Sequence, residues 1–124
     1  MEKFPRAERL RGRKLVGRLF EAGSRGAAGK AAARALANAG GANRVAAIAG
    51  KGLGGAVKRN RMRRRIRAAY RQSKNRLPQG WDLAIIARPG LLEGPWKDVR
   101  RDVILAAERA IRNAHGDGRE VRKS

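Results

Sequence analysis

The chain has 124 residues, and its 31 Lys and Arg against 10 Asp and Glu give a formal net charge of +21 at pH 7. This length predicts one domain, and so large a positive charge predicts a polyanionic partner, with nucleic-acid phosphate the simplest candidate. Because the chain has no cysteine and a single histidine, His115, the composition excludes disulfides, thiolate metal sites and histidine clusters.

No segment of the sequence predicts a membrane protein. Residues 1–15 lack the apolar run of a signal peptide, and no stretch approaches the about 18 apolar residues that a membrane-spanning helix needs. A basic helix can also lie on an anionic membrane, but the apolar side of the basic helix described below has no Trp or Phe to enter the bilayer. We therefore expect a soluble, cytoplasmic protein that does not bind membranes.

The N-terminal segment predicts a helix from Pro5 or Arg6 to Ala22. Proline is compatible with the first turn of a helix, and the apolar side chains fall on roughly one side of the segment. Gly23 follows directly and is predicted to end the helix, as a glycine after the last helical residue commonly does. The apolar residues of this helix are Leu10, Val16, Leu19 and Phe20.

The segment from Ser24 to Asn43 is ambiguous from its residues alone. Alanine dominates residues 26–37, and because alanine is the best helix former and is depleted in strands, intrinsic propensity favours a helix there. Gly40 and Gly41 then predict a turn or loop. Residues 44–49 form a short apolar run bounded by glycine-rich segments, which predicts a buried strand.

A glycine-rich segment, residues 50–55, leads into the most basic part of the chain. Glycine loops before helices can bind phosphate through backbone amides, but the Gly-Lys-Ser/Thr ending of a nucleotide-binding P-loop is missing here. We therefore interpret the segment as a linker whose backbone contacts RNA.

Residues from Lys58 to Arg76 predict an amphipathic helix, because the residues of one stripe recur mostly three and four apart and none of the run is Pro or Gly. More than half of the run is Lys or Arg. No acid occurs between Glu21 and Asp82, so these arginines repel one another unless a polyanion neutralises them. The pattern therefore favours nucleic-acid binding over a basic face kept only for solubility. At about 100° per residue the apolar side holds Met62, Ile66, Ala69, Tyr70, Ser73 and Leu77, and the basic side holds Asn60, Arg64, Arg67, Arg71 and Lys74.

Two further elements complete the predicted domain. Residues 83–87 are apolar on both faces, which predicts a central strand that is covered on both sides. Pro95 opens a last helix, whose apolar residues recur three and four apart and whose acids alternate with arginines, so we expect a packing helix with a solvated outer side. From His115 to Ser124 the glycine-rich, charged sequence predicts a disordered tail after a single RNA-binding domain of residues 1–114.

The order of these parts, rather than one motif, resembles the bacterial ribonuclease P protein subunit. The likeness covers roughly Arg6 to Ala114 and centres on Arg59, Asn60 and Arg61, which match the family's Arg-Asn-Arg signature. A Gly-x-Ala-Val stretch precedes the signature at residues 54–57, and a strand that ends in Ala-Arg follows at residues 82–88.

The resemblance implies an α/β two-layer sandwich similar to that of some ribosomal proteins. Its element order would be α-β-β-β-α-β-α, with a left-handed β-α-β crossover that departs from the usual right-handed rule. It also implies a strand near Lys30 to Ala37, against the helix propensity of that stretch.

The resemblance further implies the accessory protein of an endoribonuclease that removes the 5′ leader of precursor tRNA. Such a subunit binds the catalytic RNA through its basic helix and the single-stranded leader in a cleft between the first helix and the sheet. The residues implied to bind RNA are Lys58, Arg59, Asn60, Arg61, Arg63, Arg64, Arg67 and Arg71. The residues implied to line the leader cleft are Val16, Phe20, Arg34 and Lys51.

The chain departs from the family pattern in this cleft. Val16 and Arg34 stand where the family often has aromatic residues, so less base stacking is available and we expect leader binding to be weaker and more electrostatic. Phe20 has two interpretations, contact with the leader or filling of the core, and the sequence does not separate them.

No hydrolytic site is evident on the protein, because its acids are scattered and no nucleophile is paired with a base. The resemblance implies that Mg²⁺ is held mainly by the RNA, with no catalytic residue and no metal ligand on the protein. Asp82 at the start of its strand is more simply a turn acid than a ligand. A ribosomal or nucleoid structural protein and a protein-only nuclease are the alternative functions, and no protein oligomer is predicted.

Overall fold

The computed structural model describes residues 9, 10 and 12–123, with side chains described up to residue 114. The order of its elements is α-β-β-β-α-β-α, which confirms the predicted fold class. None of the helices in these ranges is long and apolar enough to cross a membrane. The elements are α1 (Arg13–Ala22), β1 (Ser24–Ala28), β2 (Ala31–Ala37), β3 (Arg44–Ile48), α2 (Ala56–Ser73), β4 (Trp81–Ala87) and α3 (Trp96–Lys123), with short 3-10 turns η2 (Lys51–Leu53) and η3 (Lys74–Arg76) on either side of α2.

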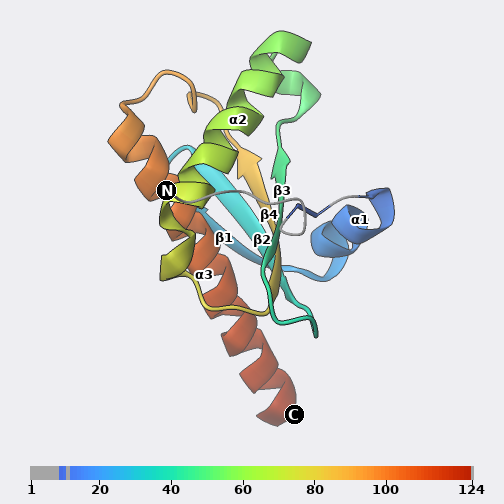
Figure 1. Ribbon diagram of the computed structural model, residues 1–124. Helices are drawn as coiled ribbons and strands as arrows, with labels where there is room; N and C mark the ends of the chain where they lie inside the picture. Colours follow the sequence, from blue (N-terminus) through green and yellow to red (C-terminus); the bar gives the residue numbers. More distant parts are fainter. Residues whose placement is uncertain (1–8, 11, 124) are drawn as a thin grey trace.

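The four strands form one sheet in the order β1-β2-β4-β3. β2 is antiparallel to both β1 and β4, whereas β3 runs parallel to β4. The predicted central strand is confirmed, because β4 lies between β2 and β3 and six of its seven residues are buried. Figure 1 shows β3 and β4 pointing the same way, with α2 in front of the sheet and β4 to the left of β3, which is the left-handed crossover.

The Ala-rich segment forms strands β1 and β2, so the helix favoured by intrinsic propensity is wrong and the strand implied by the resemblance is confirmed. Ala31, Ala33 and Ala35 are buried almost completely, while the residues between them are less buried. This period of two is that of a strand with one covered face. Tertiary packing overrides the propensity, because these small side chains lie under α3 and no single alanine prefers a helix by more than a fraction of a kcal/mol.

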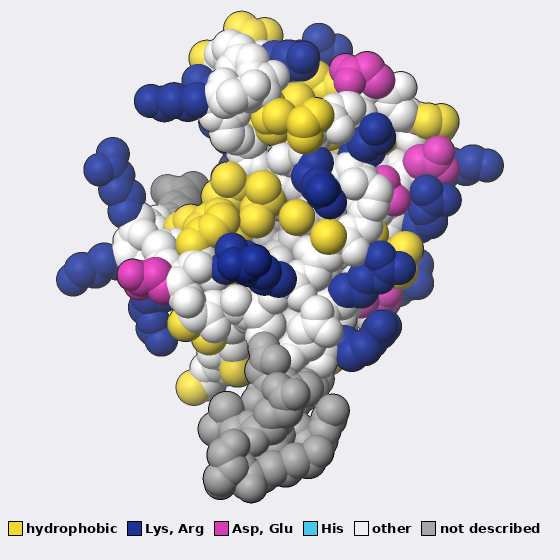
Figure 2. Space-filling view, turned by 180° about the vertical axis from the view of Figure 1, so that it is seen from behind, with side chains coloured by type: hydrophobic (Ala, Val, Ile, Leu, Met, Phe, Trp, Pro, Cys, Tyr) yellow, Lys and Arg dark blue, Asp and Glu magenta, His cyan; other side chains and the backbone are white. Residues whose placement is uncertain are grey.

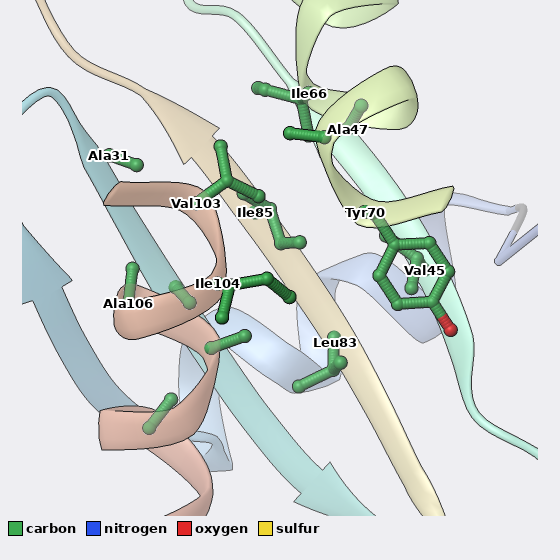
Figure 3. Packing of buried hydrophobic residues seen from close by; sticks show 14 of the residues in the cluster. Ala31, Val45, Ala47, Ile66, Tyr70, Leu83, Ile85, Val103, Ile104 and Ala106 are labelled. Atoms are coloured by element: carbon green, nitrogen blue, oxygen red, sulfur yellow. The ribbon is translucent and has the colours of Figure 1, made fainter. Parts of the chain in front are cut away.

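α2 and α3 pack side by side on one face of the sheet and enclose the main core (Figures 1 and 3). Ile66 and Tyr70 of α2 meet Leu83 and Ile85 of β4, with Ile104 of α3 beside them (Figure 3). The predicted apolar side of the basic helix is confirmed by the burial of four of its residues within α2, while Ser73 is half-buried. Those four residues are Met62, Ile66, Ala69 and Tyr70.

α1 covers only part of the opposite face of the sheet, where a smaller cluster joins Leu10 and Leu19 to Ala46 and Ala84. The predicted start of the first helix is wrong where the structure describes it. The helix begins at Arg13, and Leu10 is extended, with its backbone N–H donating to Val45 O of β3 at 2.9 Å.

The break before α1 has a local cause. Gly12 adopts a φ of +100°, which a helix cannot contain, and the backbone groups before it pair with the outer edge of β3 instead. Pro5 and Arg6 lie outside the described residues. Gly23 does follow α1 as predicted, but with an extended φ of −73°, so its left-handed freedom is not used there.

α3 begins at Trp96, directly after Pro95 as predicted, and its backbone remains helical through His115 to Lys123, where the sequence predicts disorder. Once a helix has formed, each added residue gains a hydrogen bond without a new nucleation step, so the glycine-rich stretch continues it. The domain boundary at residue 114 stays a prediction.

Asp102 of α3, expected on a solvated surface, is buried. Its carboxylate accepts a hydrogen bond from the backbone N–H of Lys30, in the β1–β2 turn, at 3.0 Å.

A substitution at Gly26 of β1 tests the close approach of α3 to this strand. A methyl group there would overlap backbone atoms of Ala106, Arg109 and Ala110 of α3. We expect Gly26→Ala to lower the free energy of unfolding by about 1–3 kcal/mol, measured in a denaturant titration.

Gly17→Ala in α1 is the matched control. A methyl group at Gly17 meets no atom within 4 Å, so the better helix propensity of alanine should raise stability slightly, by up to about 1 kcal/mol. Equal stability of Gly26→Ala and the parent protein would contradict the proposed contact.

Candidate nucleic-acid interface

The basic side of α2 forms the first candidate surface. Its first turns extend past the end of the sheet (Figure 1), and most side chains there are exposed. All eight residues predicted to bind RNA lie on α2, and none of them is fully buried. Lys58, Asn60, Arg61 and Arg64 are exposed, whereas Arg59, Arg63, Arg67 and Arg71 are half-buried.

Two contacts order side chains at the start of this helix. Arg63 Nη1 donates to Asn60 Oδ1 at 3.1 Å, one turn away, and Arg59 Nε donates to the carbonyl of Gly54 at 3.1 Å. The first bond uses the Asn60 carbonyl oxygen and one Arg63 nitrogen, and the Asn60 amide nitrogen takes no part in it. The second holds the glycine-rich segment against α2. The Arg-Asn-Arg signature therefore stands on a locally braced helix end.

Arg65, which the sequence does not place among the RNA-binding residues, serves the fold. Its Nη1 donates to Leu91 O and Gly94 O, both at 3.3 Å, and its guanidinium carbon lies 5.7 Å from the centre of the Trp96 ring. These contacts fasten the segment between β4 and α3 to α2. Trp96 is half-buried against the main core, and Trp81 is buried, so both tryptophans belong to the packing.

The described acids serve mainly to fix the fold. Asp82 accepts from Arg44 at 2.9 and 2.8 Å and from Asn38 at 2.9 Å, and the hydrogen bond to Asp82 raises the pKa of Arg44. Within the described ranges no group of three or more His, Cys, Asp or Glu side chains is arranged to hold a metal ion. Asp82 therefore joins β3, β4 and the loop after β2. Glu93 lines a hollow at the start of α2 together with Lys58 and Arg61.

The second candidate surface is the part of the sheet that α1 leaves uncovered. Figure 2 looks onto this side and shows hydrophobic side chains gathered over the sheet with Lys and Arg side chains around them. Phe20 on α1 is 40% exposed, which answers its open assignment: it does not fill the core. Arg34 of β2 donates to Phe20 O at 2.7 Å, and its guanidinium carbon lies 5.3 Å from the ring centre.

The structure brings three of the four predicted cleft residues together. Val16 precedes Phe20 by one turn of α1 and lines the same shallow hollow, and Arg34 stacks on Phe20. Lys51 is exposed in η2, and no contact in the described part of the chain joins it to the other three. It follows Ile48 of β3, which packs near Val16, and precedes α2. Lys51 thus lies along the chain between the two surfaces.

Sequence reasoning missed two arginines beside this cleft. Arg25 of β1 lies directly opposite Arg34 of β2, and Arg88 follows β4; all three line one hollow of about 500 Å³. The signal was present in the spacing, because residues 25, 34 and 88 fall on the same face once the Ala-rich segment is aligned as a hairpin. The helix assignment of that segment concealed it.

Comparison with known proteins points to one family. Residues 4–111 match the family model described as Ribonuclease P. The chain belongs to this family. The resemblance inferred from the sequence is therefore confirmed.

Relatives in the ribonuclease P family match over most of the chain. The ribonuclease P protein component of Kocuria rhizophila is 29% identical over 109 residues, covering 88% of this chain and 96% of that protein. The ribonuclease P protein component of a Roseiflexus species is 38% identical over 106 residues, covering 85% and 87% respectively.

Solved structures of ribonuclease P proteins share the fold. The Thermotoga maritima protein superposes with a TM-score of 0.72 at 24% identity, covering 81% of this chain and 96% of that one. A Staphylococcus aureus ribonuclease P protein mutant, described as defective in mRNA degradation activity, has a TM-score of 0.70 at 22% identity, with coverage of 88% and 89%. The two-layer arrangement is thus that of the family.

The basic side of α2 predicts a salt-dependent RNA affinity. Replacing the exposed pair Arg61 and Arg64 by alanine should weaken binding to bacterial ribonuclease P RNA. If each arginine contacts one phosphate, the slope of log affinity against log salt should become shallower by about 2, since each contact contributes about 0.9. Filter binding across a salt series measures both quantities.

The control removes the same charge from α3. Lys97 and Arg112 are exposed there, so their double alanine variant lowers the net charge equally. We expect its slope to remain close to that of the parent protein. Equal slopes for the two double variants would show that overall charge, not the α2 surface, controls affinity.

Proposed function

We propose that this protein is the accessory subunit of a ribonuclease P ribonucleoprotein, in which it assists removal of the 5′ leader from precursor tRNA. The basic side of α2 would bind the catalytic RNA, and the cleft formed by α1 and the uncovered sheet would bind the leader. Family membership supports the role as a ribonuclease P subunit, because the matching relatives are ribonuclease P protein components.

The observation that carries the proposal is the presence of two chemically different basic surfaces on one small domain. α2 offers a long row of cationic side chains without an aromatic on its exposed side, which suits the phosphates of a folded RNA. The cleft offers an exposed ring and a guanidinium stacked together, which suits unpaired bases. A single-stranded leader attached to a folded tRNA supplies unpaired bases of this kind.

The protein would contribute binding and positioning, while Mg²⁺ held mainly by the RNA would supply the hydrolytic chemistry. The described carboxylates do not fit a metal site on the protein, since Asp82 is occupied by Arg44 and Asn38 and Asp102 by the β1–β2 turn. No step is therefore assigned to a metal on this chain. Its own residues neutralise phosphate, orient the leader and hold the two RNAs in one complex.

Reconstitution tests the proposal. Added to bacterial ribonuclease P RNA at low Mg²⁺, the protein should increase the rate of leader removal from precursor tRNA, because cations on the protein replace part of the electrostatic neutralisation that Mg²⁺ provides. The Arg61/Arg64 double alanine variant should stimulate less, and the Lys97/Arg112 control should stimulate like the parent.

A ribosomal or nucleoid structural protein would instead bind nucleic acids without changing cleavage. A protein-only nuclease would cut precursor tRNA with no RNA subunit present. Either result would overturn the proposed function.

Leader binding has a separate prediction, because mature tRNA has no leader. Phe20→Ala should reduce the affinity of the reconstituted complex for precursor tRNA by about 1–3 kcal/mol through the loss of one base stack, and should leave mature tRNA affinity unchanged. Val57→Ala removes another exposed apolar side chain, 77% exposed at the start of α2, and serves as the control.

Lys51→Ala tests whether Lys51, the remaining predicted cleft residue, contacts the leader or the catalytic RNA. If Lys51 contacts the leader, the variant loses salt-dependent affinity for precursor tRNA only; if it contacts the catalytic RNA, assembly weakens for both substrates. Equal losses for precursor and mature tRNA in Phe20→Ala, with folding verified by circular dichroism, would remove Phe20 from the leader site.

A further inference from the structure

A hollow on the uncovered face of the sheet carries three arginines. Arg25 of β1 and Arg34 of β2 are direct cross-strand partners, and Arg88 lies just beyond the end of β4. Residues 25, 34 and 88 share the face away from α2 and α3, as the strand register shows: Arg25 pairs with Arg34, Arg34 pairs with Ala84, and Arg88 is an even number of residues beyond Ala84. We call this hollow the three-arginine pocket.

The charge of the pocket is not balanced within the described part of the chain. None of its lining residues is acidic, and none of the three guanidinium groups makes an ion pair with a described carboxylate. Like charges placed directly across two antiparallel strands destabilise the pair. Arg25 opposite Arg34 is therefore an unfavourable arrangement that an anion between them would make favourable.

The backbone around the pocket is fixed by contacts that do not involve these guanidinium groups, apart from Arg34. Asn113 of α3 donates to the carbonyl of Arg25 at 2.6 Å, and Arg109 donates to the carbonyl of Ala27 at 2.7 Å. Arg88 N donates to Lys30 O at 3.1 Å. Removing the side chains of Arg25 and Arg88, both exposed, should therefore leave the fold intact.

The size and lining of the pocket suit part of a nucleotide chain. Its volume of about 500 Å³ is within the range of small-molecule sites, and its floor includes the apolar side chains of Ala32 and Ile86. Arg34 joins it to the stacking pair, because the same guanidinium that borders the pocket lies over the Phe20 ring. A base on that pair would place its neighbouring phosphate over the pocket.

We propose that the three-arginine pocket binds the phosphodiester next to the base that stacks on Phe20 and Arg34, so that single-stranded RNA runs from α1 across β2 to β1. The proposal rests on the proposed function for the source of that strand, the leader. The guanidinium groups take the place of further aromatic platforms, and this chain holds a leader by its phosphates more than by its bases. Leader recognition is accordingly independent of base identity at this position.

The first experiment uses the isolated full-length protein and a labelled single-stranded oligoribonucleotide of about eight nucleotides. The Arg25/Arg88 double alanine variant should bind it about fivefold to tenfold more weakly at moderate salt, with a slope of log affinity against log salt shallower by about 0.7 for the one phosphate lost. The Lys97/Arg112 control should match the parent protein. Equal losses in both double variants would overturn the proposal.

The second experiment asks which source of phosphate the pocket takes. In the reconstituted complex, the Arg25/Arg88 variant should lose affinity for precursor tRNA with a leader of about eight nucleotides, but not for one whose leader has a single nucleotide. An Arg25→Lys, Arg88→Lys variant should recover part of the loss, because charge is retained. Loss of affinity for both substrates would show a role in assembly or folding and would overturn the inference.

Free anions complete the test. If inorganic pyrophosphate raises the melting temperature of the parent and of the double variant equally, the pocket is not a phosphate site. The outcomes also separate this inference from the proposed function. If the parent protein stimulates cleavage but the Arg25/Arg88 variant binds the oligoribonucleotide as tightly as the parent, only the pocket is rejected. If the parent protein does not stimulate cleavage but the variant binds the oligoribonucleotide more weakly, the leader is rejected as the source of the phosphate.

Discussion

The close packing of α3 against the Ala-rich hairpin is the contact on which the rest of the structure depends. Gly26 has no side chain, so the α3 backbone packs directly against β1 there. The small side chains of Ala31, Ala33 and Ala35 let the helix lie close to β2. With α3 held there, α2 packs beside it and the large apolar side chains gather on one face of the sheet. The other face is then left with a smaller apolar cluster and a partial cover from α1. The cleft beside α1 is the consequence of this one-sided core.

The sequence predicts well the elements whose local pattern agrees with their packing. The apolar stripe of α2 and the central strand β4 could both be identified, because spacing alone places Ile66 and Ile85 in the core. It fails where tertiary contacts decide. Alanine gives no periodic signal of its own, so β1 and β2 could be found only through the family resemblance. The start of α1 was missed because pairing with the edge of β3 involves a strand far along the chain.

The candidate site divides in the same way. The residues of α2 could be predicted as a set, since one helix carries them and their charge is visible in the sequence. The Phe20 and Arg34 pair could be placed only by analogy, because the contact joins a helix to a strand whose existence the residues did not show. Arg25 and Arg88 remained hidden for the same reason. Binding residues on a sheet surface depend on strand register, which a single sequence with weak strand signals does not specify.

The two edge strands of the sheet, β1 and β3, affect how the protein behaves in the absence of RNA. The outer edge of β3 is occupied by the backbone at Arg9 and Leu10, and carbonyls on the outer edge of β1 are occupied by Asn113 and Arg109 from α3. An unoccupied edge is a template for strand addition by a second molecule. The segments that occupy these edges therefore protect the protein from edge-to-edge aggregation in the absence of RNA.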